Sequence, residues 1–230
     1  MERHRDSRLP KKNSVNVGYS TVCRNLGEWG FSRIRPRPEA VKADPVKRSE
    51  FVKTVRLLLP KEPDLWFQDE VAFWADPAPY LVWAPKGSKP VVPRLVTHER
   101  VNVFGAVRPM DGRFYAFIAS HGNGKLFQHF LDQMQERIDP NRRTIMVLDN
   151  VRFHHGRDLD WGDNKPLYLP TYSPDLNPIE TLWLVLKKRF FNGWIPSDKE
   201  PLDHRVTNAI GYYEQQPSLV RSACAITTYL

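Results

Sequence analysis

The sequence predicts a mixed α/β domain, in which helices pack on a single sheet, together with a small basic helical arm at the N-terminus. Three observations support this prediction. Short β-rich runs are concentrated between residues 64 and 169. Two later segments carry apolar residues at helical spacing. The elements follow the order β–β–β–α–β–β–α, which differs from the regular βαβ alternation of a purely parallel sheet.

The N-terminal arm is predicted from the distribution of charge. Residues 1–56 contain 14 Lys and Arg against 6 Asp and Glu, so the whole formal net charge of +8 lies in this part of the chain. A basic arm on a neutral body favours a polyanionic partner. A solvated leader without regular structure is the alternative. We place the boundary after residue 60, which gives an arm of residues 1–60 and a body of residues 61–230.

Within the arm, residues 18–30 (GYSTVCRNLGEWG) predict a short helix with Ser20 as its N-cap and Gly30 as its stop. The next segment, RIRPRPEAVKADP, is interrupted by prolines and is predicted to be a linker. Its arginines suit contact with a phosphate backbone. Residues 48–59 then predict a short amphipathic helix that ends at Pro60.

The body is predicted to contain a series of short strands. DLWFQDE places Leu65, Phe67 and Asp69 on one strand face, and PYLVWAP is a second extended segment. VNVFGAV and RFYAFIAS are β-rich runs separated by PMDG, which is typical of a hairpin turn. TIMVLDN is a continuous apolar run that ends in an acid, as a buried central strand does, and PLYLP is the last short strand.

Two helices accompany these strands. KLFQHFLDQMQERI has apolar residues at helical spacing from Leu126 to Ile138, and a second helix begins at Asn177 with an apolar stripe that includes Trp183. No apolar run approaches the ~20 residues that a membrane span needs, and the charged N-terminus lacks the apolar core of a secretory signal. The two cysteines lie far apart, which fits a reducing, cytoplasmic compartment and argues against a structural zinc or a disulfide framework.

Three carboxylates occupy positions where such a sheet exposes its chemistry. Asp69 lies at the end of the first strand, Asp149 ends the buried strand, and Glu180 lies in the first turn of the last helix. Sites in open α/β sheets form at the carboxyl ends of strands, so Asp69 and Asp149 come side by side if their strands are neighbours. Clustered acids repel one another and are costly to bury, and a divalent cation removes that cost.

Oxygen ligation by carboxylates suits Mg²⁺ or Mn²⁺ rather than zinc. Two such ions about 3.5–4 Å apart would activate a water and stabilise a leaving 3′ oxygen in phosphodiester cleavage. Each acid also has a structural interpretation. NPIE matches a capping box around Glu180, Asp149 can begin a turn, and Asp69 can be a surface acid beside Glu70. The prolines that stiffen the approach to Glu180 favour the metal-ligand interpretation, because a metal site requires precise placement.

Five motifs occur in a fixed order along the chain: WFQDE, WAPKG, VFGAV, VLDNVRFHH and LPTYSPDLNPIETLW. From about residue 18 to the C-terminus, the chain resembles the transposases of bacterial insertion sequences in the mariner-like branch of the DDE superfamily. The segment SPDLNPIE followed by a Trp is the most specific of these motifs. The resemblance implies an RNase H-like fold with a mixed five-stranded sheet flanked by helices, in agreement with the element order.

The resemblance also implies an activity and its partners. The family's catalytic and metal-binding triad falls on Asp69, Asp149 and Glu180. The implied activity is Mg²⁺- or Mn²⁺-dependent cleavage of double-stranded DNA at transposon ends, followed by joining of the 3′ end to target DNA. A homodimer in a synaptic complex and a place at the bacterial nucleoid are implied as well, with no membrane partner.

Further residues are expected around this triad. His154 matches a histidine that the family often carries after the second acid, and we expect His154, Asn150 and Asn177 to support the metal ligands. A surface histidine is the alternative. The expected DNA contacts are Arg24, Arg33, Arg35, Arg37, Lys187 and Lys188.

The chain departs from the family pattern in two places. Only 19 residues precede Ser20, so its helix is expected to be the remnant of a helix-turn-helix region whose earlier helices are missing. The spacer of 30 residues between Asp149 and Glu180 is also shorter than usual. The chain is therefore interpreted as a possible truncated copy. The alternative functions are a non-catalytic DNA-binding protein and a different nuclease of the RNase H fold.

Overall fold

The computed structural model describes residues 18–32, 42–76, 84–85, 87–89, 91, 98–197, 199–226 and 229. The chain divides into two compact units, Met1–Glu39 and Ala40–Leu230. This division falls earlier than the predicted boundary after residue 60, because the helix before that boundary packs on the second unit. The predicted strand PYLVWAP and the linker RIRPRPEAVKADP lie largely outside the described residues, as does the whole of 33–41.

The described part of the first unit contains one helix, α1 (Tyr19–Glu28). Its N-cap is Gly18, and Ser20 lies within the first turn, so the predicted Ser20 cap is wrong. The predicted stop is confirmed, because Gly30 follows the helix with a φ of 81° that favours glycine. None of the residues of α1 is buried.

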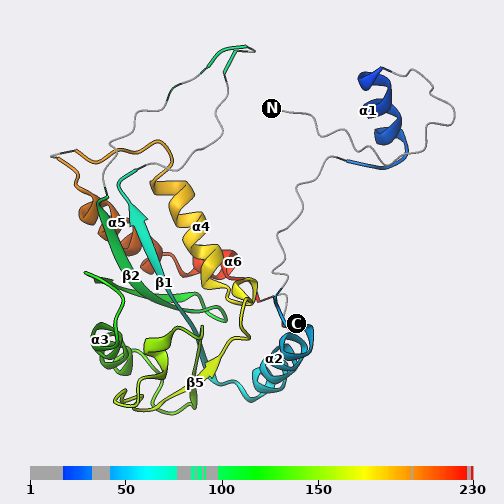
Figure 1. Cartoon of the computed structure of the whole chain (residues 1–230). Coiled ribbons are helices and arrows are strands. Elements are labelled where there is room, and N and C mark those ends of the chain that lie inside the picture. The colour runs from blue at the N-terminus through cyan, green and yellow to red at the C-terminus, as the bar shows by residue number, and fades with distance from the viewer. Residues whose placement is uncertain are drawn as a thin grey trace. The chain divides into compact units, whose positions relative to one another are not determined.

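The second unit is built on a five-stranded mixed sheet with the order β3-β2-β1-β4-β5 (Figure 1). The strands are β1 (Asp64–Trp74), β2 (Arg100–Arg108), β3 (Arg113–Ala119), β4 (Thr144–Leu148) and β5 (Asn164–Tyr168). β1 pairs antiparallel with β2 and parallel with β4. The predicted hairpin, the buried TIMVL strand and the neighbouring first and fourth strands are thereby confirmed.

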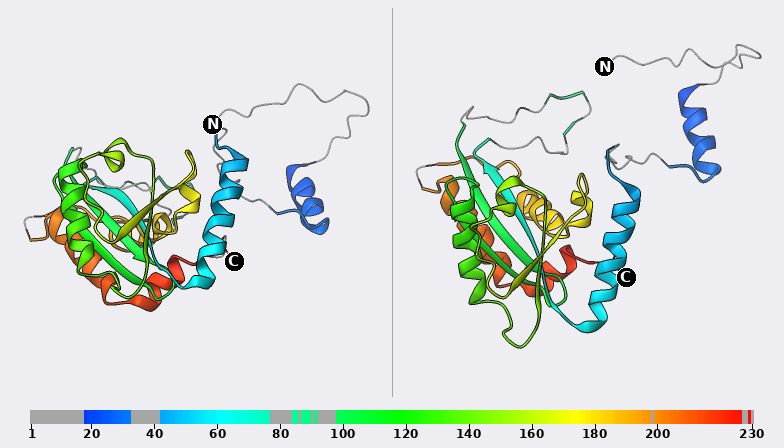
Figure 2. Two further views of the ribbon diagram at one scale, coloured as in Figure 1. Left: turned by 90° about the horizontal axis from the view of Figure 1, so that it is seen from below. Right: turned by 60° about the horizontal axis from the view of Figure 1, so that its bottom comes forward.

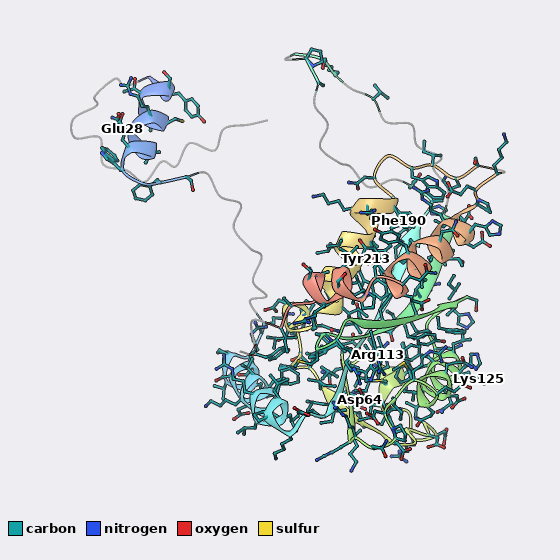
Figure 3. All side chains as sticks on the ribbon, turned by 180° about the vertical axis from the view of Figure 1, so that it is seen from behind. Glu28, Asp64, Arg113, Lys125, Phe190 and Tyr213 are labelled. Atoms are coloured by element: carbon teal, nitrogen blue, oxygen red, sulfur yellow. The ribbon has the colours of Figure 1, made fainter. Side chains whose placement is uncertain are left out.

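Helices cover both faces of the sheet (Figure 1). α3 (Gly124–Gln135) packs on one face through Phe127, Phe130 and Met134. α4 (Ile179–Phe190), α5 (Leu202–Glu214) and α6 (Pro217–Ala223) cover the other. The last two helices were not predicted. Figure 3 shows Phe190 and Tyr213 where α4 meets α5, and their ring centroids are 6.3 Å apart.

Helix α2 (Pro45–Leu58) begins at the Asp44 cap and joins the second unit through its buried residues Phe51 and Val55. The chain then forms a 3₁₀ turn, η1 (Leu59–Lys61). The C-terminal end of the chain lies beside α2 in both views of Figure 2, and the ring centroids of Phe51 and Tyr229 are 6.2 Å apart. Contact with a residue so distant in the sequence explains why α2 belongs to the body.

The chain contains two further described 3₁₀ turns. η2 (Arg152–His155) follows β4, and η3 (Pro174–Leu176) precedes α4. Among the residues that the structure describes, no helix is both long enough and apolar enough to cross a membrane.

Candidate functional site

Strand register brings the first two acids together. β1 continues to Trp74, so Asp69 lies inside this strand and not at its end, as the sequence had predicted. The pairing of β1 with β4 nevertheless stops at Phe67, which is level with Val147. Asp69 and Asp149 each follow this last pair by two residues. The two carboxylates therefore emerge at one level, where β1 has lost its parallel neighbour.

The third acid arrives on α4. The turn η3 and the residue Pro178 lead into the helix, and Glu180 lies in its first turn. Asp69, Asp149 and Glu180 line one cavity of about 340 Å³, whose wall includes the segment from Leu169 to Pro174. The structure thus brings together the three carboxylates that the sequence singled out.

Negative charge is disfavoured on two of these acids, Asp69 and Glu180. Burial raises the pKa of Asp69 to about 8, and the carboxylates of Glu180, Glu70 and Asp149 act in the same direction. Burial also raises the pKa of Glu180, although Lys187 opposes this effect. In the absence of a cation, the charged form of Asp69 is therefore disfavoured at neutral pH.

Lys187 brings a positive charge close to two of the acids, Glu180 and Asp69. It lies about two turns after Glu180 on α4 and is partly buried, and its ammonium lies 5.3 Å from the centroid of the Phe73 ring. Burial lowers the pKa of Lys187, and the charges of Glu180 and Asp69 oppose this effect.

His154 lies between two acids. This residue is buried; its Nε2 is 2.9 Å from Oε1 of Glu70, and its Nδ1 is 3.0 Å from Oδ1 of Asp149. Burial favours the neutral ring, but hydrogen bonds to Asp149 and Glu70 raise the pKa of His154 to about 9. The ring is therefore a cation at neutral pH that donates to both carboxylates. The backbone N–H of Val151 donates to the same oxygen of Asp149, at 3.1 Å.

Glu70 also lies at the site, although no sequence pattern assigned it there. Side chains alternate along β1, so Glu70 points to the face opposite Asp69, where Gln68 donates to it at 2.7 Å. Ligand atoms of Glu70, Asp149 and His154 lie within 4.8 Å of one another. Both ring nitrogens of His154 already contact acids, so we interpret this cluster as an ion bridge. The sequence shows that Glu70 directly follows Asp69. It does not show that the turn η2 brings His154 to Glu70.

The two predicted asparagines act on the backbone around the site. Asn150 donates to the carbonyl of Leu169 in the wall of the cavity, and Asn177 donates to the carbonyl of Gln68 at 2.9 Å. The capping-box interpretation is not confirmed, because the N-cap of α4 is Pro178 and makes no side-chain cap bond. The amide oxygen of Asn177 is buried and has no hydrogen-bond partner among the described residues.

The predicted DNA contacts are distributed over the chain. Arg24 lies on α1 with its guanidinium 3.9 Å from Glu28, and Lys188 is exposed near the end of α4. The remaining three arginines, Arg33, Arg35 and Arg37, lie outside the described residues.

The donor set fits a divalent cation. All three acids that line the cavity offer oxygen atoms, which Mg²⁺ and Mn²⁺ prefer. Burial and the neighbouring carboxylates raise the pKa of Asp69, and a divalent cation would offset both effects.

Comparison with known families agrees with this site. The family described as DDE superfamily endonuclease matches residues 64–203, which is more than half of the chain and includes all three acids. A winged helix-turn-helix family matches residues 11–55, which include α1 and most of α2.

Two curated proteins are similar to this chain in sequence. An insertion element IS630 39 kDa protein of Shigella sonnei is 25% identical over 179 residues, which are 75% of this chain and 52% of that protein. The protein y4pE/y4sA of Sinorhizobium fredii is 27% identical over 101 residues, or 44% of this chain and 75% of that protein. The chain thus spans about half the length of the insertion-element protein.

Solved structures show the same fold. The Mos1 mariner paired-end complex with Mn has a TM-score of 0.64 and 14% identity, over 93% of this chain and 71% of that one. The catalytic domain of Mos1 mariner transposase has a TM-score of 0.51 and 11% identity, over 85% of this chain and 98% of that one. These likenesses confirm the RNase H-like architecture predicted from the sequence.

Proposed function

The chain belongs to the DDE superfamily endonucleases, in the branch that includes the insertion-element and mariner transposases, and on this premise we propose that it cuts DNA at transposon ends and joins the 3′ ends to target DNA. One observation carries the proposal: Asp69 of β1, Asp149 just after β4 and Glu180 of α4 line a single cavity, in which burial and the neighbouring carboxylates raise the pKa of Asp69. The catalytic residues are then Asp69, Asp149 and Glu180.

The same three carboxylates are proposed to hold divalent cations, Mg²⁺ or Mn²⁺, as a pair. Bound there, the ions would activate a water and stabilise the leaving 3′ oxygen. The protein's own contribution is to hold the acids at fixed positions. Register sets Asp69 and Asp149, and η3 with Pro178 sets the entry of α4 and hence Glu180. His154 holds Asp149 by donating to one of its oxygens.

DNA is the proposed partner. The helix-turn-helix match at residues 11–55 and the positive charge of residues 1–56 support DNA binding by the N-terminal part of the chain. Its proposed phosphate contacts are Arg24, Arg33, Arg35 and Arg37. Lys187 and Lys188 on α4 are proposed to meet DNA near the acids. A homodimer that pairs two transposon ends is proposed as the active assembly, by analogy with the Mos1 paired-end complexes.

The domain arrangement follows from the same observations. We propose that residues before Ala40 serve DNA binding and that the unit Ala40–Leu230 carries the chemistry, with α2 belonging to the second unit although the helix-turn-helix family extends over it.

Nicking of a supercoiled plasmid tests the function. With Mg²⁺ or Mn²⁺, the wild type is expected to nick DNA, and Asp149→Asn is expected to lower the rate by at least about 100-fold, the scale of losing one electrostatic contribution to a transition state. Asp158→Asn is the matched control, since Asp158 is an exposed acid outside the cavity.

Three outcomes would contradict the proposal. Equal nicking by wild type and Asp149→Asn would exclude the catalytic assignment. Binding of DNA without any cleavage would favour a non-catalytic DNA-binding protein. Preferred cleavage of an RNA–DNA hybrid would favour a different nuclease of the same fold.

A further inference from the structure

Two residues outside the acid triad, a glycine of VFGAV and the tryptophan of PIETLW, meet on one face of the sheet. VFGAV places Gly105 in β2, and the Trp of PIETLW is Trp183, three residues after Glu180 in α4. Gly105 is the cross-strand partner of Asp69. Paired residues of antiparallel strands point to the same face, so a side chain at position 105 would stand beside the Asp69 carboxylate.

The indole of Trp183 fills the space that such a side chain would need. A Cβ atom at position 105 would lie 2.5 Å from two ring carbons of Trp183 and 3.3 Å from Cδ1 of Ile179. Carbon atoms normally approach one another to about 3.5–4.0 Å. Gly105 is not among the residues with positive φ. Glycine is therefore required here for space and not for backbone conformation.

The seated indole makes a directed contact with the site. Its Nε1–H donates to Oδ2 of Asp69 at 3.1 Å, and Trp183 is only 2% exposed. The Phe73 and Phe114 rings pack against it at steep angles, with ring centroids 6.3 and 5.6 Å away. An indole N–H is a donor only, so it can orient a carboxylate but cannot compete with it for a cation.

We propose that Trp183 is a positioning residue for the metal site. Its indole occupies the space that the missing side chain of Gly105 leaves open, and from there it fixes the Asp69 carboxylate by a direct hydrogen bond. It also sets the orientation of Glu180, because both residues belong to α4. Residues three apart lie on one side of a helix, so an anchored Trp183 restricts the rotation of α4 that would move Glu180. The inference rests on the proposed function, because it assumes that Asp69 and Glu180 hold the cation.

Calorimetric titration with Mn²⁺ tests the hydrogen bond. Trp183→Phe keeps an aromatic ring and removes the donor, and it is expected to weaken Mn²⁺ binding about 10- to 100-fold, as losses of partners to metal ligands do. Trp66→Phe is the matched control, because Trp66 is equally buried and its Nε1 has no hydrogen-bond partner among the described residues. We expect it to bind Mn²⁺ as the wild type does.

A second pair of variants tests whether the indole needs the open space above Gly105. Gly105→Ala keeps the indole but displaces it, so Mn²⁺ binding is expected to weaken on the same scale as in Trp183→Phe. Gly211→Ala adds the same methyl group on α5, where nothing lies within 4 Å of the new atom, and is expected to leave binding unchanged. If Gly105→Ala does not fold, Trp183→Phe alone decides the question.

Two further readouts distinguish a positioning role from packing alone. If Trp183 only packs, Trp183→Phe would lower the thermal unfolding midpoint in EDTA and leave the Mn²⁺ affinity equal to that of wild type, and this result would overturn the inference. The indole NMR resonance of Trp183, identified by its loss in Trp183→Phe, is expected to move in Asp69→Asn while that of Trp66 stays. An unmoved resonance would also overturn the inference.

Absence of Mn²⁺ binding by the wild type would instead overturn the proposed metal site, and the positioning role with it.

Discussion

At the scale of single residues, His154 bridges two carboxylates, one on β1 and one just after β4. Its protonated ring donates to Glu70 on one side and to Asp149 on the other. Without the ring, these carboxylates would face each other across a partly buried gap. Unpaired charge in such a place costs more free energy than the bond itself provides.

His154→Leu is therefore expected to lower the free energy of unfolding by about 1–3 kcal/mol, a value reduced from that of fully buried pairs because the Asp149 side chain is 43% exposed. Urea unfolding in EDTA measures this change. His204→Leu, at an exposed histidine on α5, is the control, and we expect a change within about 0.5 kcal/mol. Equal midpoints for His154→Leu and wild type would contradict the prediction.

The sequence predicted the convergence of Asp69, Asp149 and Glu180 better than it predicted the contacts around them. Asp69 and Asp149 are foreseeable because each belongs to a strand pattern, and Glu180 because prolines mark its helix start. Glu70 and Trp183 gain their roles from contacts across the fold: Glu70 contacts His154 of the η2 turn, and Trp183 of α4 contacts Asp69 of β1. A local pattern identified Trp183 as a core residue but carried no information about the acceptor of its N–H.

At the scale of elements, the β2–β3 hairpin depends on one glycine. Gly112 has a φ of 78°, and a Cβ there would lie 1.9 Å from the carbonyl oxygen of Pro217, at the start of α6. Both the backbone conformation and the contact with α6 thus exclude a side chain. The motif PMDG predicted a hairpin turn here, and only the fold reveals why position 112 excludes a side chain.

Gly112→Ala is expected to destabilise the second unit by more than about 2 kcal/mol, since it adds a steric clash to an unfavourable backbone conformation. Gly211→Ala, within α5 and without near neighbours, is expected to be neutral or to stabilise by up to about 1 kcal/mol. Thermal unfolding of both variants provides the comparison. A Gly112→Ala protein as stable as wild type would show that the turn can rearrange.

Helix α2 is connected to the loop before Glu180 by a forked ion pair. Arg48 donates to both carboxylate oxygens of Asp175 in η3, at 2.9 and 2.6 Å. These hydrogen bonds lower the pKa of Asp175. A depressed folded pKa contributes stability above the unfolded value of 3.8, and this contribution is lost as the pH falls through the folded pKa.

A double-mutant cycle with Arg48→Met and Asp175→Asn is expected to give a coupling energy of about 0.5–1 kcal/mol at pH 7, because the Asp175 side chain is 64% exposed and solvent weakens the pair. The coupling is expected to fade in acid as Asp175 becomes protonated. Urea unfolding at several pH values between 7 and 3 measures it. A coupling energy independent of pH would show that charge does not carry the contact.

At the scale of the whole molecule, Tyr229 near the C-terminus connects distant elements of the second unit. Tyr229 packs on Phe51 of α2 and Phe67 of β1, and its hydroxyl donates to the carbonyl of Leu176 before α4. The early helix α2, the central strand and the approach to Glu180 therefore share one core. No local pattern predicts such contacts, which explains why the sequence assigned α2 to the arm and left α5 and α6 unrecognised.

The two cysteines report on the two units separately. Cys23 is exposed on α1, whereas Cys224 is buried in the core that contains Tyr229. Burial raises the pKa of the Cys224 thiol to about 12, so it carries almost no thiolate in the folded protein. Reaction at Cys224 then requires the C-terminal part of the core to open.

With a thiol-reactive chromophore, one equivalent is expected to react rapidly in the native protein, and the second at least about 1000-fold more slowly, as expected for a group released only by opening of a stable core. Cys23→Ser is expected to remove the fast phase and leave the slow one. If the C-terminal segment unfolds together with α2, Phe51→Ala, which removes a ring that packs against Tyr229, speeds the slow phase and leaves the fast phase unchanged. If the rate of the slow phase is the same in Phe51→Ala as in the wild type, the C-terminal segment opens independently of the core around β1.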